Sequence, residues 1–500
     1  MTLIDWIILG LYASSTIGLG WWMSRRQKDT SEYFVGSGRM NSLLIGVSLF
    51  ATLLSTITYL AIPGEVLGKG PVYLSNYISY PFVFLVMGFW ILPVYMRRRV
   101  TSAYELLETR LGLSVRLLGM SMFILLRLVW MSLLVFLTSK AIAIMIGAGE
   151  EWVPWIVAVT GLFAITYTSL GGLKAVVITD LMQTILLYGG ALLVIGTVTW
   201  KMGGFGWFPT TWQTDVWDHQ PIFSLDPSTR VTVVGSVLSV FLWMVCTSMG
   251  DQVSVQRFMA TENVRAARRS IAMQLSIGLV VGVTLGFVGV SLLGFYQAHP
   301  DLLPETGGLD VQADKIFSHF IAFQLPPVVT GLVVSGLFAA AMSSIDSGVN
   351  SITAVVMTDL LDRFGRKPEN EVQHVRYARI LAFGIGCAVV LLSSFMDHIP
   401  GNFLAVTNKT VNLLTAPIAL LFFFAVFVPF ASTTGVWLAT VASVSAAAMV
   451  AFSGEIFGKD PETGLDPVTF QWISPVALVV GLTVGVVASR IFPRKDKEGV

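Results

Sequence analysis

The sequence predicts an all-α integral membrane protein with thirteen transmembrane helices. Hydrophobic residues make up 54% of its 500 positions and charged residues only 12%, too few to cover a water-soluble globule. Apolar runs of about 20 residues recur along the whole chain, and each can cross a hydrocarbon core of ~30 Å as a helix. Both cysteines, Cys246 and Cys387, lie inside apolar runs and indicate neither a disulfide framework nor a metal cluster. A net charge of +1 gives no sign of nucleic-acid binding.

The predicted spans follow one another without room for a separate soluble domain. We place them at residues 3–23, 42–68, 72–96, 116–147, 152–171, 173–201, 231–250, 271–297, 326–350, 377–397, 402–428, 433–453 and 471–492. No Lys or Arg precedes the first run, whereas Arg25, Arg26 and Lys28 follow it. We therefore interpret that run as a retained helix with its N-terminus outside, and not as a signal peptide.

The distribution of positive charge supports this topology. With the N-terminus outside, 23 of the 31 Lys and Arg residues fall in predicted inner loops, Arg257 among them. The predicted outer segments hold only Lys69, Lys201, Arg230, Lys315 and Lys459. Because cytoplasmic loops are enriched in Lys and Arg, we expect a multi-pass protein of the cell membrane with a cytoplasmic C-terminus.

One polar helical face stands out in the ninth span. Ser343, Asp346, Ser347 and Asn350 are spaced i, i+3, i+4 and i+7, so they share one side of a helix. Ionisable groups at that depth usually mark an ion or substrate path, and these hard oxygens suit a small alkali cation. The alternative is a packing face of small residues whose hydroxyls bond to their own helix, but it leaves Asp346 unexplained.

The second span carries signals of an interruption. Ser55, Thr56 and Thr58 lie at mid-membrane, and Pro63 follows within two turns. We expect unwinding around residues 51–56, where freed carbonyls can coordinate Na⁺. The alternative is an ordinary proline kink with hydroxyls bonded back to the helix.

Asp180 is a second buried carboxylate, about two turns into the sixth span and without an adjacent basic residue in the sequence. A lone aspartate at this depth would bind a cation or take up a proton. The alternative is a carboxylate that caps a neighbouring helix.

Four segments carry a resemblance to a known family. They are TSAYELLETRLG at 101–112, YTSLGGLKAVVITDLMQ at 167–183, VQRF at 255–258 and FAAAMSSIDSGVNS at 338–351. Together they resemble the sodium:solute symporter family, in particular its sialic acid and monocarboxylate or vitamin branches, over nearly the full chain. The resemblance implies a single transmembrane domain with the leucine-transporter-type fold. An extra N-terminal helix (1–41) would precede two inverted five-helix repeats (42–202 and 231–430), followed by two C-terminal helices and a short tail (431–500).

The same resemblance implies sodium sites. Its common site would use the carbonyls of Ala51, Leu54 and Ala340 with the hydroxyls of Ser343 and Ser344. A second site, found in some members, would fall on Asp180, Ser343, Asp346 and Ser347. The sialic acid transporters carry serine where this chain has Asp346, so the number of coupled Na⁺ ions, one or two, remains open. Two nearby carboxylates would either bind Na⁺ more tightly or repel each other until one of them is protonated.

The resemblance also locates a solute pocket beside the common sodium site. Its expected lining is Ser55, Thr56, Thr58, Tyr73, Asn76, Tyr77, Arg127, Trp130, Trp243 and Thr247. Arg127 suits bidentate recognition of a carboxylate, although the arginine of the sialic acid transporters aligns with Trp130, one turn further on. The alternative role for Arg127 is structural, paired with an acid such as Asp251.

These observations lead us to expect a Na⁺-coupled symporter that imports a small organic acid by alternating access. The expected partners are Na⁺, a small polar solute and the lipid bilayer, with the monomer as the functional unit. A neutral sugar or polyol is the alternative solute, and an uncoupled channel or uniporter is the alternative from another class. Coupling to protons is also open, because both aspartates could titrate. We see no nucleophile and base pair or metal-ligand spacing, so we do not expect an enzyme.

Overall fold

All the secondary structure that the structure describes is helical. The computed structural model describes residues 1–24, 33–34, 36–97, 100–303, 309, 313–366, 370–396, 403–461 and 464–494. The main helices are α1 (Leu3–Ser24), α3 (Ser42–Leu53), α4 (Thr56–Lys69), α5 (Tyr80–Leu85), α6 (Leu92–Arg97), α7 (Glu105–Leu111), α8 (Leu113–Ile146), α9 (Val153–Lys201), α10 (Val233–Gly250), α11 (Gln252–Met259), α12 (Val264–Ala298), α13 (Ala313–Phe323), α14 (Val329–Val355), α15 (Glu371–Ser393), α16 (Phe403–Phe427), α17 (Thr433–Ala451), α18 (Ser453–Phe457) and α19 (Ile473–Ile491).

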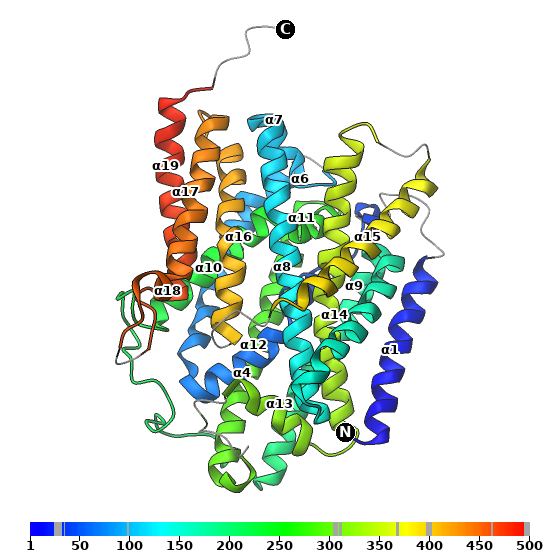
Figure 1. Ribbon diagram of the computed structural model, residues 1–500, viewed down its shortest axis with the longest axis vertical. Helices are drawn as coiled ribbons and strands as arrows, with labels where there is room; N and C mark the ends of the chain where they lie inside the picture. The colour runs from blue at the N-terminus through cyan, green and yellow to red at the C-terminus, as the bar shows by residue number, and fades with distance from the viewer. Residues whose placement is uncertain are drawn as a thin grey trace.

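The long helices form one bundle. Helices α17 and α19 pack together at one edge, and α1 packs against α9 and α14 at the opposite edge (Figure 1). Helix α1 begins at one end of the bundle and α19 finishes at the other, as an odd number of crossings requires (Figure 1). The charges of the first predicted inner loop, Arg25, Arg26 and Lys28, lie outside the described residues.

The membrane architecture is confirmed, but the count of thirteen spans is not. Within the described chain, eleven helices are long and apolar enough to cross a membrane, or twelve when α3 and α4, bent by 66°, count as one. The predicted span 152–171 corresponds to a shorter apolar helix, Val153–Thr166. It is continuous with the next span within α9, across a kink at Gly172 (φ 59°, ψ −177°) that favours glycine.

The second span is interrupted, as the sequence predicts, over two residues. Leu54 (φ −88°, ψ 102°) and Ser55 (φ −90°, ψ 166°) are extended, so α3 ends at Leu53. The Ser55 hydroxyl caps α4 by accepting the N–H of Thr58 at 3.2 Å. Pro63 lies inside α4, which continues to Lys69, so the interruption is not at the proline.

A second interruption lies between α10 and α11. Asp251 (φ −94°, ψ 122°) ends α10, and its carboxylate caps α11 by accepting the N–H of Val253 at 2.9 Å. Every residue of α11 is buried. The prediction that the stretch after residue 250 is an inner loop is wrong. The carboxylate of Asp251 caps a new helix, which begins inside the bundle.

The helix between Pro71 and Arg97 changes type along its length. It begins as a 3₁₀ helix (Pro71–Ser79, η2), becomes α5, passes through a π-helix (Val86–Ile91, η3) and ends as α6. Helix α12 approaches it closely at Gly282, where a β-carbon would overlap the hydroxyl of Tyr77. Long 3₁₀ stretches often mark functional hinges.

Helix α1 is tied to the start of α14. The Asp5 carboxylate accepts the N–H groups of Val328 at 2.9 Å and of Gly331 at 3.0 Å. Val328 has φ 74° and ψ −52°, a region that a β-branched residue rarely adopts. The extra N-terminal helix therefore stabilises a strained entry into α14.

Candidate functional site

The serine-rich helix α14 lies against the interruption between α3 and α4. The Thr56 hydroxyl donates to the carbonyl of Leu337 at 2.9 Å, and the hydroxyls of Thr52 and Ser347 lie 2.9 Å apart. In addition, the Ser344 hydroxyl donates to the carbonyl of Thr52 at 3.3 Å. The structure thus brings together the two segments that the sequence analysis selected from opposite halves of the chain.

The five residues expected at the common sodium site come from these two facing segments, and all are buried: Ala51, Leu54, Ala340, Ser343 and Ser344. Because α3 stops at Leu53, its last carbonyls lack partners further along the helix. The N–H of Leu54 donates to the carbonyl of Phe50 at 2.9 Å. The carbonyl of Ala51, one residue further along the chain, is therefore available to bind a cation. Carbonyl and hydroxyl oxygens of this kind fit a small hard cation.

Asp180 does have a basic partner, contrary to the sequence analysis. Its carboxylate lies 3.5 Å from Nη2 of Arg257, and both side chains are fully buried. It also accepts hydrogen bonds of 2.5 Å from the hydroxyls of Ser48 and Ser343. Arg257 was assigned to an inner loop, but α11 carries it into the bundle. The two residues are 77 positions apart, so the pattern around Asp180 gave no sign of the pair.

The Arg257 guanidinium reaches the oxygens expected around a second sodium ion. Its Nε donates to the Ser48 hydroxyl at 2.8 Å, and its Nη2 donates to the Ser347 hydroxyl at 2.5 Å. Its Nη1 donates to the carbonyl of Val253 at 3.1 Å, within α11. The positive charge among the oxygens around Asp180 is therefore the side chain of Arg257.

Asp346, the other carboxylate of the expected second site, has a different hydroxyl partner. It accepts a hydrogen bond from Thr168 of α9, on the N-terminal side of the kink at Gly172. Asp346 belongs to α14 itself, whereas Asp180 approaches that helix from α9 and bonds to Ser343.

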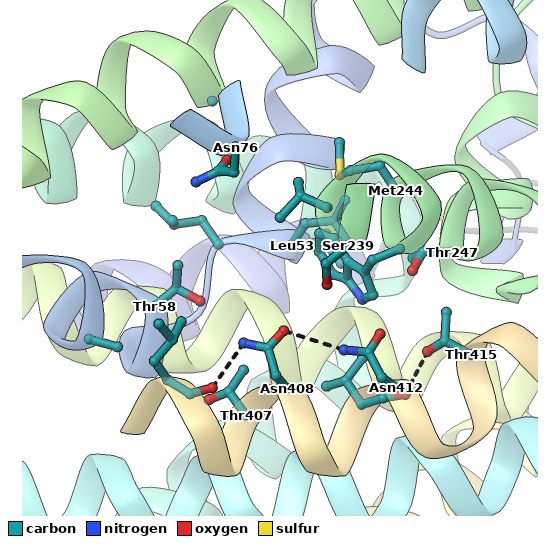
Figure 2. A pocket seen from close by; sticks show the side chains of 18 of the residues that line it. Leu53, Thr58, Asn76, Ser239, Met244, Thr247, Thr407, Asn408, Asn412 and Thr415 are labelled. Atoms are coloured by element: carbon teal, nitrogen blue, oxygen red, sulfur yellow. Dashed lines mark hydrogen bonds between the residues drawn. The ribbon is translucent and has the colours of Figure 1, made fainter. Parts of the chain in front are cut away.

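A cavity lies beside the interruption, between α3, α4, η2, α8, α10, α12 and α16. Its atom-free volume is about 1330 Å³, with the open mouth included. Eight of the ten expected solute-binding residues line it: Thr58, Tyr73, Asn76, Tyr77, Arg127, Trp130, Trp243 and Thr247. Ser55 and Thr56 do not, because Ser55 caps α4 and Thr56 bonds to α14. Figure 2 shows Thr58, Asn76 and Thr247 around this cavity.

One wall of the cavity, on α16, was missed by the sequence analysis. Thr407, Asn408, Asn412 and Thr415 follow one face of that helix (Figure 2). Ser474 of α19 donates to Oδ1 of Asn412 at 2.8 Å, and Nδ2 of Asn412 donates to Oδ1 of Asn408 at 3.3 Å. These bonds fix the orientation of both amides. Their helical spacing within an apolar run is a sequence signal that could have identified them.

The cavity contains a buried ion pair, the alternative left open for Arg127. Nη2 of Arg127 donates to a carboxylate oxygen of Asp251. The two residues are only 7% and 6% exposed. Nε of Arg127 and the Thr247 hydroxyl, one turn before Asp251, are buried without a hydrogen-bond partner in the described part of the chain. Asp251 therefore links α8 to the interruption between α10 and α11.

The segment TSAYELLETR packs against this interruption and against α16, where Nε of Arg110 donates to the carbonyl of Ala425 at 3.3 Å. The Tyr104 hydroxyl donates to the carbonyl of Gly250 at 3.1 Å, and Nε2 of Gln252 donates to the carbonyl of Thr101 at 2.7 Å. Further out, Arg116 binds Glu108 at 2.6 Å, and Arg363 binds the same carboxylate at 2.6 Å. Hydrogen bonds from Arg363 and Arg116 lower the pKa of Glu108 to about 2.

Comparison with known proteins agrees with this geometry. The model of the sodium:solute symporter family matches residues 33–443. The chain is 28% identical over 453 residues to the sodium/sialic acid symporter NanT of Aliivibrio fischeri, covering 88% of this chain and 86% of the relative. It is 29% identical over 467 residues to the sodium/sialic acid symporter SiaT of Proteus mirabilis, covering 91% and 90%.

Among solved structures, the fold is similar to a substrate-bound, outward-open state of a Na⁺-coupled sialic acid symporter. The TM-score is 0.85 at 25% identity, and the match covers 99% of both chains.

Proposed function

Because the chain belongs to the sodium:solute symporter family, we propose that it couples the inward flow of Na⁺ to the import of a small organic acid by alternating access. One observation carries the choice of an acid: Arg127 lines the cavity with Nε buried and unpartnered. A guanidinium in a membrane span is costly, and a carboxylate ligand gives it a function. The sodium/sialic acid symporters among its relatives support a solute of the sialic acid or monocarboxylate type.

The sodium ion would bind between α14 and the end of α3. The carbonyls of Ala51, Leu54 and Ala340 and the hydroxyls of Ser343 and Ser344 offer it hard oxygens in a buried site. Each Na⁺ that enters contributes about 2.3 kcal/mol per 100 mV of membrane potential. Leu54 also lines the cavity, so sodium and solute would each raise the affinity for the other.

The sequence left open whether one or two Na⁺ ions are coupled, and we propose one. The guanidinium of Arg257 lies among Asp180, Ser347 and Ser48, where a second ion was expected. A fixed positive charge there would repel a mobile cation.

The structural frame of this proposal is the one expected from the family. An N-terminal segment (1–41) would precede inverted repeats at 42–202 and 231–430, with the N-terminus outside and the C-terminus cytoplasmic, in a functional monomer. The hydrogen bonds that join Thr101 and Tyr104 to the interrupted helix support a cavity closed toward the cytoplasm and open to the outside.

A neutral sugar or polyol is the second candidate solute. Arg127 is already paired with Asp251, and the amides of Asn408 and Asn412 suit hydroxyl groups equally well.

A ligand screen on the purified full-length protein tests the choice. Thermal stabilisation would be measured for carboxylic acids, their methyl esters and neutral sugars, each with and without Na⁺. The proposal expects stabilisation by acids that requires Na⁺ and is lost on esterification. Ligands that bind equally well as esters would support the neutral solute. Uptake into liposomes that is driven by a pH gradient in sodium-free buffer would contradict coupling to Na⁺.

A further inference from the structure

We propose that the transported acid carries a positively charged amino group next to its carboxylate, and that Asp251 binds the amino group while Arg127 binds the carboxylate. This inference rests on the proposed import of a small organic acid and changes the class of that acid: a zwitterion, such as an amino acid, in place of the sialic acid or monocarboxylate type that the relatives support.

The charges on the cavity wall are the first support. Among the described residues that line the cavity, only Arg127 and Asp251 carry a full charge. They come from different elements, α8 and the interruption between α10 and α11, and meet in one buried ion pair. The wall therefore presents one positive and one negative group at a single place.

The hydrogen bonds of the pair show which ligand fits. Nη2 of Arg127 donates to Asp251, whereas Nε, which donates from the same edge of the guanidinium, has no partner. A ligand carboxylate at Nε would lie beside the Asp251 carboxylate, and two like charges on one guanidinium edge repel. Displacing Asp251 instead would leave a buried carboxylate unpaired, which is costly.

An ammonium group next to the ligand carboxylate removes this repulsion. The charges then alternate, with guanidinium against carboxylate and ammonium against Asp251. The ion pair between Arg127 and Asp251 stays intact, and each new contact is a charge-assisted hydrogen bond.

Two further features of the wall suit an ammonium group. The unpartnered hydroxyl of Thr247 lies one helical turn before Asp251 and can accept a second of its three N–H bonds. Six aromatic residues also line the cavity, and ring faces attract cations: Phe50, Tyr73, Tyr77, Tyr80, Trp130 and Trp243. Trp130 is one turn from Arg127 on α8, so an aromatic ring lies close to the charged pair.

The test compares 2-aminobutyrate with two ligands that each lack one of its charged groups: butyrate, without the amino group, and propylamine, without the carboxylate. Affinities would be measured by calorimetry on the full-length wild-type protein in saturating Na⁺. We expect 2-aminobutyrate to bind about tenfold or more tightly than butyrate, the gain from one charge-assisted hydrogen bond, and propylamine to bind weakly. This ranking needs no variant, so it holds even if substitutions impair folding.

The variant Asp251→Asn adds a direct test of the carboxylate. Asparagine caps helices as well as aspartate does, so α11 should keep its start. The variant should lose about tenfold in affinity for 2-aminobutyrate and should gain affinity for butyrate. Asp226→Asn, in an outer segment away from the cavity, is the matched control and should change neither affinity.

The possible failures are distinguishable. If butyrate binds as tightly as 2-aminobutyrate, or if Asp251→Asn weakens both ligands equally, the zwitterion inference is wrong and the proposed function stands. If no carboxylate-bearing ligand binds in Na⁺ while neutral sugars do, the proposed function itself is wrong.

Discussion

The guanidinium of Arg257 lies 3.5 Å from the carboxylate of Asp180 inside the bundle, and neither side chain reaches solvent. Arg257 belongs to α11 and Asp180 to α9, while their shared hydroxyl partner, Ser48, belongs to α3. The pair therefore joins three helices next to the serine face of α14.

Replacing Arg257 by glutamine should destabilise the protein in sodium-free buffer. The variant leaves Asp180 buried without its partner, and breaking a buried pair in this way costs about 3–5 kcal/mol. Sodium should restore part of the loss, because the oxygens around Asp180 can then bind a free cation. The measurement is the thermal unfolding temperature with and without Na⁺.

The matched control for this variant is the double substitution Arg257→Gln with Asp180→Asn, which removes both charges. It should lose less stability than Arg257→Gln alone and should not be rescued by Na⁺. Equal losses in the single and double variants would contradict the importance of the pair.

Ser343→Ala should raise the Na⁺ concentration for half-maximal uptake by about tenfold, the effect of losing one hydrogen-bonding oxygen to a charged group, with a smaller change in maximal rate. Ser343 lies on the face of α14 that meets the interruption, and its hydroxyl also donates to Asp180. Thr353→Val is the control, because the Thr353 hydroxyl donates to the carbonyl of Val349 in its own helix and to no other group in the described part of the chain. A wild-type Na⁺ dependence in Ser343→Ala would remove this residue from the sodium site.

The features that the sequence predicts here are those with a local period. The serine face of α14 follows helical spacing, and the interruption follows from Ser55, a residue that caps helices. Pairs between distant segments were predictable only in part: the pair of Arg127 and Asp251 was an open alternative, whereas nothing near Asp180 indicates Arg257. Lys409 and Asp466 show the same limit, because they bind each other at 2.7 Å across 57 positions of the chain.

Acid should destabilise the protein partly through Glu108. Hydrogen bonds from Arg363 and then Arg116 hold the pKa of this carboxyl at about 2, below its ordinary value of 4.5. Because the folded pKa is lowered, the stabilisation is complete above about pH 4.5 and is lost as the pH falls toward 2. Melting temperatures between pH 6 and 3 should therefore fall more steeply for the wild type than for Glu108→Gln. Parallel curves would contradict the assignment.

Val328→Gly should stabilise the protein. Valine at φ 74° stores about 1–3 kcal/mol of backbone strain, whereas glycine adopts this conformation freely and costs about 0.5–1 kcal/mol in entropy. The expected net gain is about 1 kcal/mol in unfolding free energy. The control is Val329→Gly at the first residue of α14, where glycine should destabilise the helix. A lower unfolding temperature for Val328→Gly would show that Asp5 holds this backbone without strain.

Gly282→Ala should impair both packing and solute binding, because its β-carbon would overlap the hydroxyl of Tyr77 in the cavity wall. Tyr77 is in the 3₁₀ helix η2, and a displaced ring would enter the cavity or push η2 away from α12. Either movement should weaken solute binding at least tenfold while Na⁺ still stabilises the protein. Gly196→Ala is the control, because a β-carbon there meets nothing within 4 Å. Adding Tyr77→Ala to Gly282→Ala should recover the unfolding temperature, since the overlap depends on that ring. If the double variant is no more stable than Gly282→Ala, the glycine is needed for a different reason than room for Tyr77.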